Sequence, residues 1–289
     1  MEKPVSAAGH KVPGSIAQVG VVMRYSFLDY LRSRRFVILL VITFIIGGLL
    51  TGVVGYYRPA GFLGSPLSFL SGWWGLSVTL ITVLSGIFFG GDAISGEFQN
   101  KTGYFTLPNP IRRSSVYVGK WLSAFTASSI ILFIFTAITL ANAFYYFPGM
   151  SIPWQFGESL LFAWFYLVGV LGFTFFFSSL FKSSSYSILI TAILFLFAFN
   201  LIDTIVSAFA QVEPWFSITY GSQIIGNILT TPYPDHITKV AAGFGPRAGA
   251  AATFTSYNVT IPEGLAIIGI YFLVTAALGL ILFERKEFN

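Results

Sequence analysis

Six apolar runs, each long enough to cross a lipid bilayer, constrain the fold of this chain more than any other feature. A helix needs roughly 20 apolar residues to span the hydrocarbon core. The runs cover residues 36–56, 71–91, 120–147, 157–181, 187–210 and 263–283. Only 9% of the residues are charged, whereas soluble domains have about 25%. The sequence therefore predicts an all-α polytopic membrane protein with a single transmembrane domain over residues 1–289, since a β-barrel would show alternating segments of about ten residues.

The distribution of lysine and arginine predicts how the chain crosses the membrane. Of the 16 basic residues, all but Arg58, Lys239 and Arg247 lie in the N-terminal segment, the loops after spans 2 and 4, or the C-terminal end. Because cytoplasmic loops have an excess of positive charge, both termini are expected in the cytoplasm and the protein in the plasma membrane. Trp73 and Trp74 are expected in an interfacial aromatic belt. The basic residues flank spans, so the net charge of +5 does not indicate nucleic-acid binding.

The polar segment before the first apolar run predicts a retained anchor with an interfacial helix. It is too long for a cleavable signal peptide, and no A-x-A site follows. Residues 15–34 repeat apolar side chains at helical spacing, with Ser15 as a candidate N-cap. A helix too polar to span should lie in the membrane interface. Arg32, Arg34 and Arg35 are expected to be snorkelling anchors on the N-terminal flank of span 1. The alternative is a short soluble helix that packs on loops of the same chain.

The most polar part of the middle of the chain is the loop of residues 92–119, which the charge distribution assigns to the cytoplasm. It contains Glu97, a Lys-Thr-Gly turn, a Pro-Asn-Pro break and an Arg-Arg pair. Residues 94–104 can form a short helix that ends near Gly103. Glu97 is suited to orient a partner protein through charge-assisted hydrogen bonds. The alternative is a solvated i,i+4 pair of Glu97 with Lys101, which contributes only about 0.3 kcal/mol.

These features resemble the permease subunits of the type-2 ABC exporter family. The layout is similar in the interfacial helix before span 1 and in the long external segment between spans 5 and 6. The motifs of the polar loop are also similar, and they comprise Asp92 to Phe98, Lys101 to Gly103, Leu107 to Arg112, and Gly119 with Lys120. The similarity in layout covers nearly the whole chain, whereas the motif identity is confined to this loop.

The resemblance implies a permease that dimerises with a second copy or a paralogue and rests on two copies of an ABC ATPase. Substrate would pass between spans 2 and 5 of the two permeases. A short coupling helix would seat in the ATPase, and the matching coupling positions are Asp92, Glu97, Phe98, Lys101, Thr102, Arg112 and Lys120. The chain contains no G-x-x-x-x-G-K-[ST] phosphate loop. ATP and magnesium are therefore expected on the partner ATPase, and no cofactor is expected in this chain.

Polar and aromatic residues of spans 2 and 5 are candidates for the substrate pathway. Asn200 and Asp203 lie in the outer half of span 5, where ionisable groups usually face a cavity or a partner, although Asp203 also fits an interfacial position. Phe195 and Phe199 are candidates for an apolar gate or for lipid-facing packing. Thr82 belongs to a stripe of small polar residues that marks either the dimer seam or a helix contact within the chain.

The segment of residues 211–262 is expected outside the membrane, partly as helix. Residues 218–229 have helical character, whereas the Ala/Gly-rich run of residues 241–252 gives no assignment. The form expected for the segment is a re-entrant or surface-lying helix. Asn258 begins a glycosylation sequon, and whether it is used stays open. The two histidines, His10 and His236, are predicted on opposite sides of the membrane, and cysteine is absent. No metal site is therefore expected.

The function predicted from these features is ATP-driven export of an amphipathic or hydrophobic substrate, such as a peptide, a lipid or a drug-like molecule. The chain itself would be a transporter subunit and not an enzyme. An ATPase-independent channel or ion-coupled carrier is the alternative, which would need charged or broken helices in the membrane. A purely structural membrane subunit is a further alternative. An aspartyl protease is disfavoured, because Asp92 and Asp203 would lie near opposite faces of a core roughly 30 Å thick.

Overall fold

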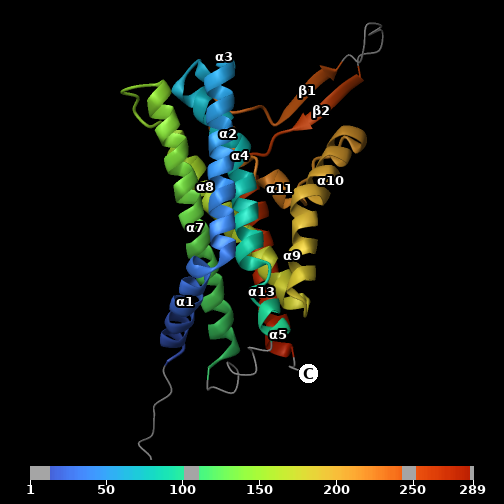
Figure 1. Cartoon of the computed structure of the whole chain (residues 1–289). Helices are drawn as coiled ribbons and strands as arrows, with labels where there is room; N and C mark the ends of the chain where they lie inside the picture. The colour runs from blue at the N-terminus through green and yellow to red at the C-terminus, as the bar shows by residue number, and fades with distance from the viewer. Residues whose placement is uncertain (1–13, 101–110, 243–251, 287–289) are drawn as a thin grey trace, which may run out of the picture.

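The computed structural model describes residues 14–100, 111–242 and 252–286, and it is predominantly helical (Figure 1). Six helices in these ranges are long and apolar enough to cross a membrane. They are α2 (Arg34–Tyr57), α4 (Pro66–Gly90), α7 (Arg113–Tyr146), α8 (Trp154–Leu180), the column Ser184–Ala210 and α13 (Ile261–Arg285). A single turn, α3 (Ala60–Leu63), joins α2 to α4. The prediction of an all-α fold with six spans is confirmed.

Helix α8 packs between α13 and α4, and glycine allows the close approach. A Cβ added to Gly169 would lie 3.0 Å from Ile268 Cγ2, and one added to Gly172 would lie 2.9 Å from Thr275 Oγ1. Gly86 of α4 likewise leaves space for Val170. Small residues of this kind let the backbones of membrane helices approach closely. Van der Waals packing then holds the helices together, because burial of apolar surface does not favour protein over lipid.

The tryptophan pair of α4 is fully buried, which corrects the prediction of an interfacial belt. The Trp74 ring stacks on Phe135 of α7 at a centroid distance of 5.7 Å. Its indole Nε1 donates to Ser159 Oγ of α8 at 2.9 Å. Trp74 therefore connects three spans, because a buried indole nitrogen requires an acceptor and here finds one on a neighbouring helix.

Helix α1 (Ser15–Arg32) lies along the first half of α7 (Figure 1). Gly119 of α7 faces Val22 so closely that an added Cβ would lie 2.8 Å from Val22 Cβ. Ser123 Oγ donates to the Met23 carbonyl at 2.8 Å. The buried Gln18 accepts a hydrogen bond from the Arg112 backbone N–H at 3.1 Å. Helix α1 is thus attached to the bundle over its length, and its location in the membrane interface stays a prediction.

The fifth span is a column of four consecutive helical segments. They are α9 (Ser184–Ile193), the π-helix η1 (Leu194–Ala198), α10 (Phe199–Ile205) and the π-helix η2 (Val206–Ala210). The column is the least buried of the six spans, and its far end diverges from the bundle in Figure 1. Its exposed apolar side chains are Leu189, Ile193, Phe197, Leu201, Ile202, Ile205 and Phe209.

The segment between the fifth and sixth spans begins with helix and then forms a β-hairpin where only helix was expected, and most of its Ala/Gly-rich run lies outside the described residues. Helices α11 (Ile218–Gly221) and α12 (Ile224–Asn227) are followed by the strands β1 (Ile237–Ala242) and β2 (Ala252–Tyr257). The strands pair antiparallel, with Ile237 opposite Tyr257. Both contain β-branched residues, which favour strands, and in β2 threonine occurs at every second position, at Thr253 and Thr255. The hairpin projects from the end of the molecule opposite α5 (Figure 1).

Candidate functional site

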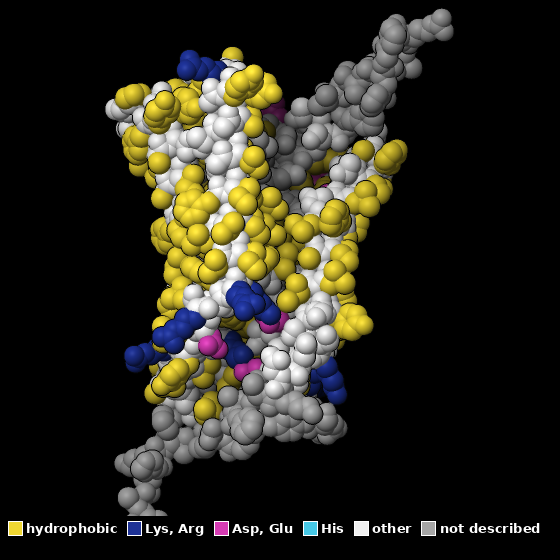
Figure 2. Space-filling view, in the orientation of Figure 1, with side chains coloured by type: hydrophobic (Ala, Val, Ile, Leu, Met, Phe, Trp, Pro, Cys, Tyr) yellow, Lys and Arg dark blue, Asp and Glu magenta, His cyan; other side chains and the backbone are white. Residues whose placement is uncertain are grey.

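A charged groove lies between α1 and the short helix α5 (Ser95–Gln99), at the end of the molecule that holds the C-terminus (Figure 1). Its volume is about 640 Å³. Its charged lining residues are Asp29, Arg32, Arg35, Asp92, Glu97 and Lys120. Figure 2 shows basic and acidic side chains gathered at this end, beyond the apolar band of the spans. We call this feature the α5 groove.

An ion pair between Arg35 and Asp92 joins the start of α2 to the turn that follows α4. Next to it, the Tyr30 hydroxyl donates to the Phe89 carbonyl at 2.9 Å. Burial, and secondarily the Asp92 carboxylate, raise the pKa of Tyr30 above its usual 10.0, so this hydroxyl stays a neutral donor. The prediction of Arg35 as a snorkelling anchor is incomplete, because its guanidinium has a protein partner.

A second ion pair connects α5 to α7. The Lys120 Nζ lies 2.7 Å from Glu97 Oε1, and the two side chains are only 17% and 12% exposed. The same ammonium donates to the Ala93 carbonyl at 2.8 Å. Glu97 was expected either to contact a partner protein or to pair with Lys101 in solvent. Its described partner is instead Lys120, which is in a different helix and is mostly shielded from water.

Hydrogen bonds of a serine and a glutamine side chain attach both ends of α5 to neighbouring helices. Ser178 Oγ of α8 accepts hydrogen bonds from the backbone N–H groups of Ile94 and Ser95, at 2.9 and 3.0 Å. These N–H groups belong to the first turn, which has no partners within the helix. At the other end, Gln99 Oε1 accepts from the Ser184 backbone N–H at 2.7 Å. Helix α5 is therefore attached to α8 and to the first residue of the fifth span.

The C-terminal end of α13 covers one side of α5. The Lys286 ammonium lies 4.3 Å from the centroid of the Phe98 ring, a cation–π contact. It also donates to the carbonyls of Ser179 and Phe181, at 2.9 and 2.8 Å. Burial, together with the nearby Lys182 charge, lowers the pKa of Lys286 to about 8. At neutral pH Lys286 is therefore still protonated and contacts both α5 and the end of α8.

The structure brings together four of the seven predicted coupling residues, namely Asp92, Glu97, Phe98 and Lys120. Arg112 is exposed and contributes its backbone N–H to α1. Lys101 and Thr102 lie outside the described residues. The partners Arg35, Tyr30, Ser178 and Lys286 were not predicted for this site. Their positions close to span ends were the only indication in the sequence that they could belong to this site. The indication was weak, because many polar residues lie at span ends.

A second cavity, of about 600 Å³, lies between α4, the fifth span and the α11–α12 segment. It contains three predicted pathway residues, namely Phe195, Asn200 and Asp203. Asp203 Oδ2 accepts hydrogen bonds from Ser217 Oγ at 2.9 Å and from Thr219 Oγ1 at 2.5 Å. Its other oxygen, Oδ1, is buried without a partner in the part of the chain that the structure describes. Asp203 is therefore a partly unsatisfied carboxylate in a cavity wall.

The other two predicted pathway residues do not line this cavity. Thr82 is 1% exposed and donates to the Val78 carbonyl of its own helix at 2.8 Å. Phe199 packs in an aromatic cluster, with its ring centroid 5.6 Å from that of Phe195 and 5.7 Å from that of Phe173. Of the two roles open for Thr82, the geometry favours a helix contact within the chain. Phe199 packs against the ring of the cavity residue Phe195.

Six helices long and apolar enough to span a membrane define a multi-pass membrane protein, with a charged groove at one end and a cavity between helices. A family model described as "ABC-2 family transporter protein" matches residues 21–288. The chain therefore belongs to the ABC-2 transporter family, in which it is a membrane component. The comparison with individual curated proteins gave no match.

Proposed function

We propose that this chain is the membrane-spanning subunit of an ATP-driven exporter, powered by a separate ABC ATPase that docks on the α5 groove. The observation that supports this most directly is the attachment of α5 to three spans. Ser178 joins it to α8, Lys120 joins it to α7, and Gln99 joins it to the start of the fifth span. A displacement of α5 by a partner would therefore move several spans together.

The proposed orientation has the α5 end in the cytoplasm, together with both termini, and the β-hairpin outside. The excess of lysine and arginine around the α5 end supports this orientation through the positive-inside rule. It also places the coupling surface on the side where ATP is present. ATP and magnesium would bind to the partner ATPase, because the chain contains no phosphate-loop motif.

We further propose that two copies of the chain, or one copy and a paralogue, form the pathway, with one ATPase under each. The fifth span supports this arrangement, since it leaves an apolar face uncovered along its length. The cavity beside it combines apolar Leu80 and Val83 with polar Asn200 and Asp203. A lining of this kind suits an amphipathic substrate that passes between spans 2 and 5.

An ATPase-independent carrier is the second candidate, which the two π-helical segments of the fifth span favour. The π-helices η1 and η2 break the regular α-helix on either side of α10. Carriers use discontinuous helices to build their substrate sites. The two candidates differ in whether transport requires a second chain that hydrolyses ATP.

Purification of the tagged protein from native membranes tests the proposal. We expect an ATPase subunit with a phosphate loop to co-purify. In liposomes, we expect accumulation of fluorescent amphipathic peptides or dyes only when this ATPase and ATP are both present. Recovery of the chain without an ATPase, together with transport driven by an ion gradient alone, would establish the carrier instead.

Asp203→Asn is expected to impair the passage of cationic amphipathic dyes while docking of the ATPase stays normal. The variant keeps an acceptor for Ser217 and Thr219 but removes the charge from the cavity. The dye then loses a charge-assisted contact with the carboxylate; hydrogen bonds to charged groups are worth about 1.5–3 kcal/mol, so uptake should fall by roughly tenfold or more. Asp235→Asn, which changes an exposed carboxylate near the hairpin, is the matched control. Equal uptake by both variants would remove Asp203 from the pathway.

A further inference from the structure

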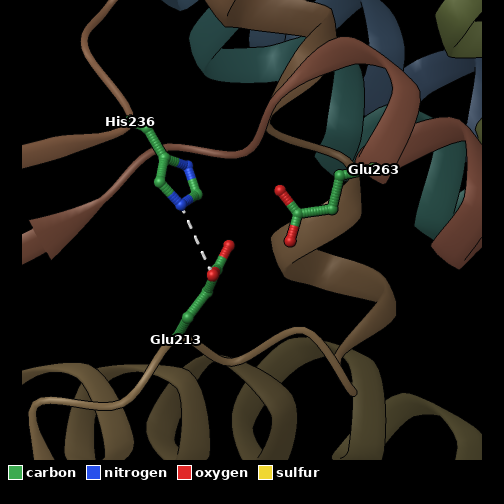
Figure 3. A group of neighbouring side chains, drawn as sticks. All are labelled: Glu213, His236 and Glu263. Carbon is green, nitrogen blue, oxygen red and sulfur yellow. Dashed lines mark ion pairs between the residues drawn. The ribbon is translucent and has the colours of Figure 1, made fainter.

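Three side chains from separate segments converge beneath the β-hairpin (Figure 3). Glu213 follows the fifth span, His236 immediately precedes β1, and Glu263 lies in the first turn of α13. One candidate ligand atom from each residue lies within 4.8 Å of the other two. His236 Nε2 is 3.4 Å from Glu213 Oε2. This cluster is separate from the α5 groove and does not line the cavity beside the fifth span.

A contact between the second ring nitrogen of His236 and a backbone carbonyl holds the imidazole in an orientation that suits metal binding. Its Nδ1 lies 2.9 Å from the Asn258 carbonyl oxygen. Because a carbonyl only accepts, Nδ1 donates a proton to it, and Nε2 is the ring nitrogen that faces Glu213 and could bind a metal ion. Metal-binding histidines almost always donate their other ring N–H to an outer partner, and a backbone carbonyl is one of the usual partners.

Glu213 also has an outer partner that holds it in place. The Tyr220 hydroxyl, whose residue is only 1% exposed, donates to Glu213 Oε1 at 2.6 Å. Glu263 is held less firmly, by the capping box with Thr260 at the start of α13. In the described residues, neither carboxylate forms an ion pair with a lysine or arginine. Two neighbouring carboxylates thus face a single imidazole, an arrangement that a cation would stabilise.

We infer that Glu213, His236 and Glu263 form a binding site for a divalent transition-metal ion, with Zn²⁺ as the best match. One imidazole and two carboxylates supply the borderline and hard donors that Zn²⁺ accepts in a tetrahedral site, with water as the fourth ligand. Calcium and magnesium prefer all-oxygen sites, which makes the histidine a poor ligand for them. Zinc–ligand distances of about 2.1 Å require the three side chains to move together by about an ångström.

Such an ion would add a direct link between three parts of the segment that joins the fifth and sixth spans. Glu213 follows the end of the fifth span, His236 precedes the hairpin and Glu263 begins α13. Tyr220, which contacts Glu213, and Tyr257 of β2 both line the cavity beside the fifth span. The metal would therefore fix the position of the hairpin over this cavity. This inference does not depend on which partner drives transport.

Calorimetric titration of the metal-stripped, full-length protein with Zn²⁺ tests the site, with metal content measured in parallel. We expect one Zn²⁺ per chain and a higher temperature of unfolding when Zn²⁺ is bound. Tyr220→Phe should weaken binding by about 10- to 100-fold, the usual effect of losing an outer-shell partner. His236→Ala should weaken binding more strongly than Tyr220→Phe. Glu263→Gln removes a ligand charge but keeps the capping box, since glutamine also serves at that position.

Two controls keep the test specific. His10→Ala removes the other histidine of the chain, and Asp235→Asn removes the carboxylate adjacent to His236. Both variants should bind Zn²⁺ as the wild type does. Absence of Zn²⁺ binding in the folded wild type would show that the cluster is only a hydrogen-bonded group, and equal binding by His236→Ala would also overturn the inference. Equally tight binding of Mg²⁺ or Ca²⁺ would refute the assignment to a transition metal.

Discussion

Lys120→Met is expected to uncouple ATP hydrolysis from transport. The substitution keeps an unbranched side chain but leaves the mostly buried Glu97 carboxylate without its partner, 2.7 Å away in the wild type. Removing one member of a buried ion pair costs about 3 kcal/mol, whereas loss of an exposed pair costs about 0.5 kcal/mol. A change of about 3 kcal/mol shifts the equilibrium between docked and displaced α5 by roughly a hundredfold. The ATPase should still hydrolyse ATP, but transport per ATP should fall strongly.

A double-mutant cycle distinguishes coupling from simple loss of charge. Glu97→Gln alone leaves Lys120 unpaired and should also uncouple transport. The double variant removes both charges together, and replacement of a whole buried pair by neutral groups is often nearly neutral. The double variant should therefore transport better than either single variant. Transport per ATP is measured in liposomes that contain the partner ATPase.

Asp29→Asn is the matched control for that cycle. Asp29 lines the same groove but forms no ion pair in the residues that the structure describes. Its substitution should change coupling less than either single variant, because it leaves no buried charge without its partner. Wild-type coupling in both single variants would refute the role of the Glu97–Lys120 pair, and equal loss in Asp29→Asn would attribute the effect to net charge.

Gly119→Val is expected to separate α1 from α7 and to lower the stability of the protein. A Cβ at this position would lie 2.8 Å from Val22 Cβ and 3.0 Å from the Val19 carbonyl oxygen. The second contact is with backbone, so rotation of a side chain does not relieve it and α1 itself must move. Overpacking of this kind costs about 1–3 kcal/mol. Because α1 forms one wall of the α5 groove, docking of the ATPase should weaken as well.

The same substitution on the facing helix provides the control for this prediction. Gly20 lies in α1, and an added Cβ there would meet nothing within 4 Å. Gly20→Val should be neutral or slightly stabilising, because valine has a higher helix propensity than glycine. Thermal unfolding measures the loss of stability in Gly119→Val. Faster trypsin cleavage at Arg24 would show that α1 separates from α7. A wild-type unfolding temperature and unchanged cleavage in Gly119→Val would show that the contact between α1 and α7 is dispensable.

Some residues of the two candidate sites could be predicted from the sequence, and others could not. Asp92, Glu97 and Lys120 were predicted from the polar break between two apolar runs, and the structure places all three in the α5 groove. The pairing itself was not predicted, because Asp92 pairs with Arg35 and Glu97 with Lys120 across different helices. The Glu213–His236–Glu263 cluster was missed entirely, because its members come from three segments whose approach depends on an unpredicted hairpin.

The sequence by itself determined the number and type of the spanning elements. An apolar run of sufficient length must form a helix in lipid, since every backbone polar group there needs an internal partner. The tertiary structure alone decided how each helix is rotated. Lipid and protein interior are about equally apolar, so hydropathy did not show that Trp74 is buried against Ser159 instead of lying at the interface. Only the packed structure revealed which charges at the α5 end form ion pairs, because the paired residues lie in different helices.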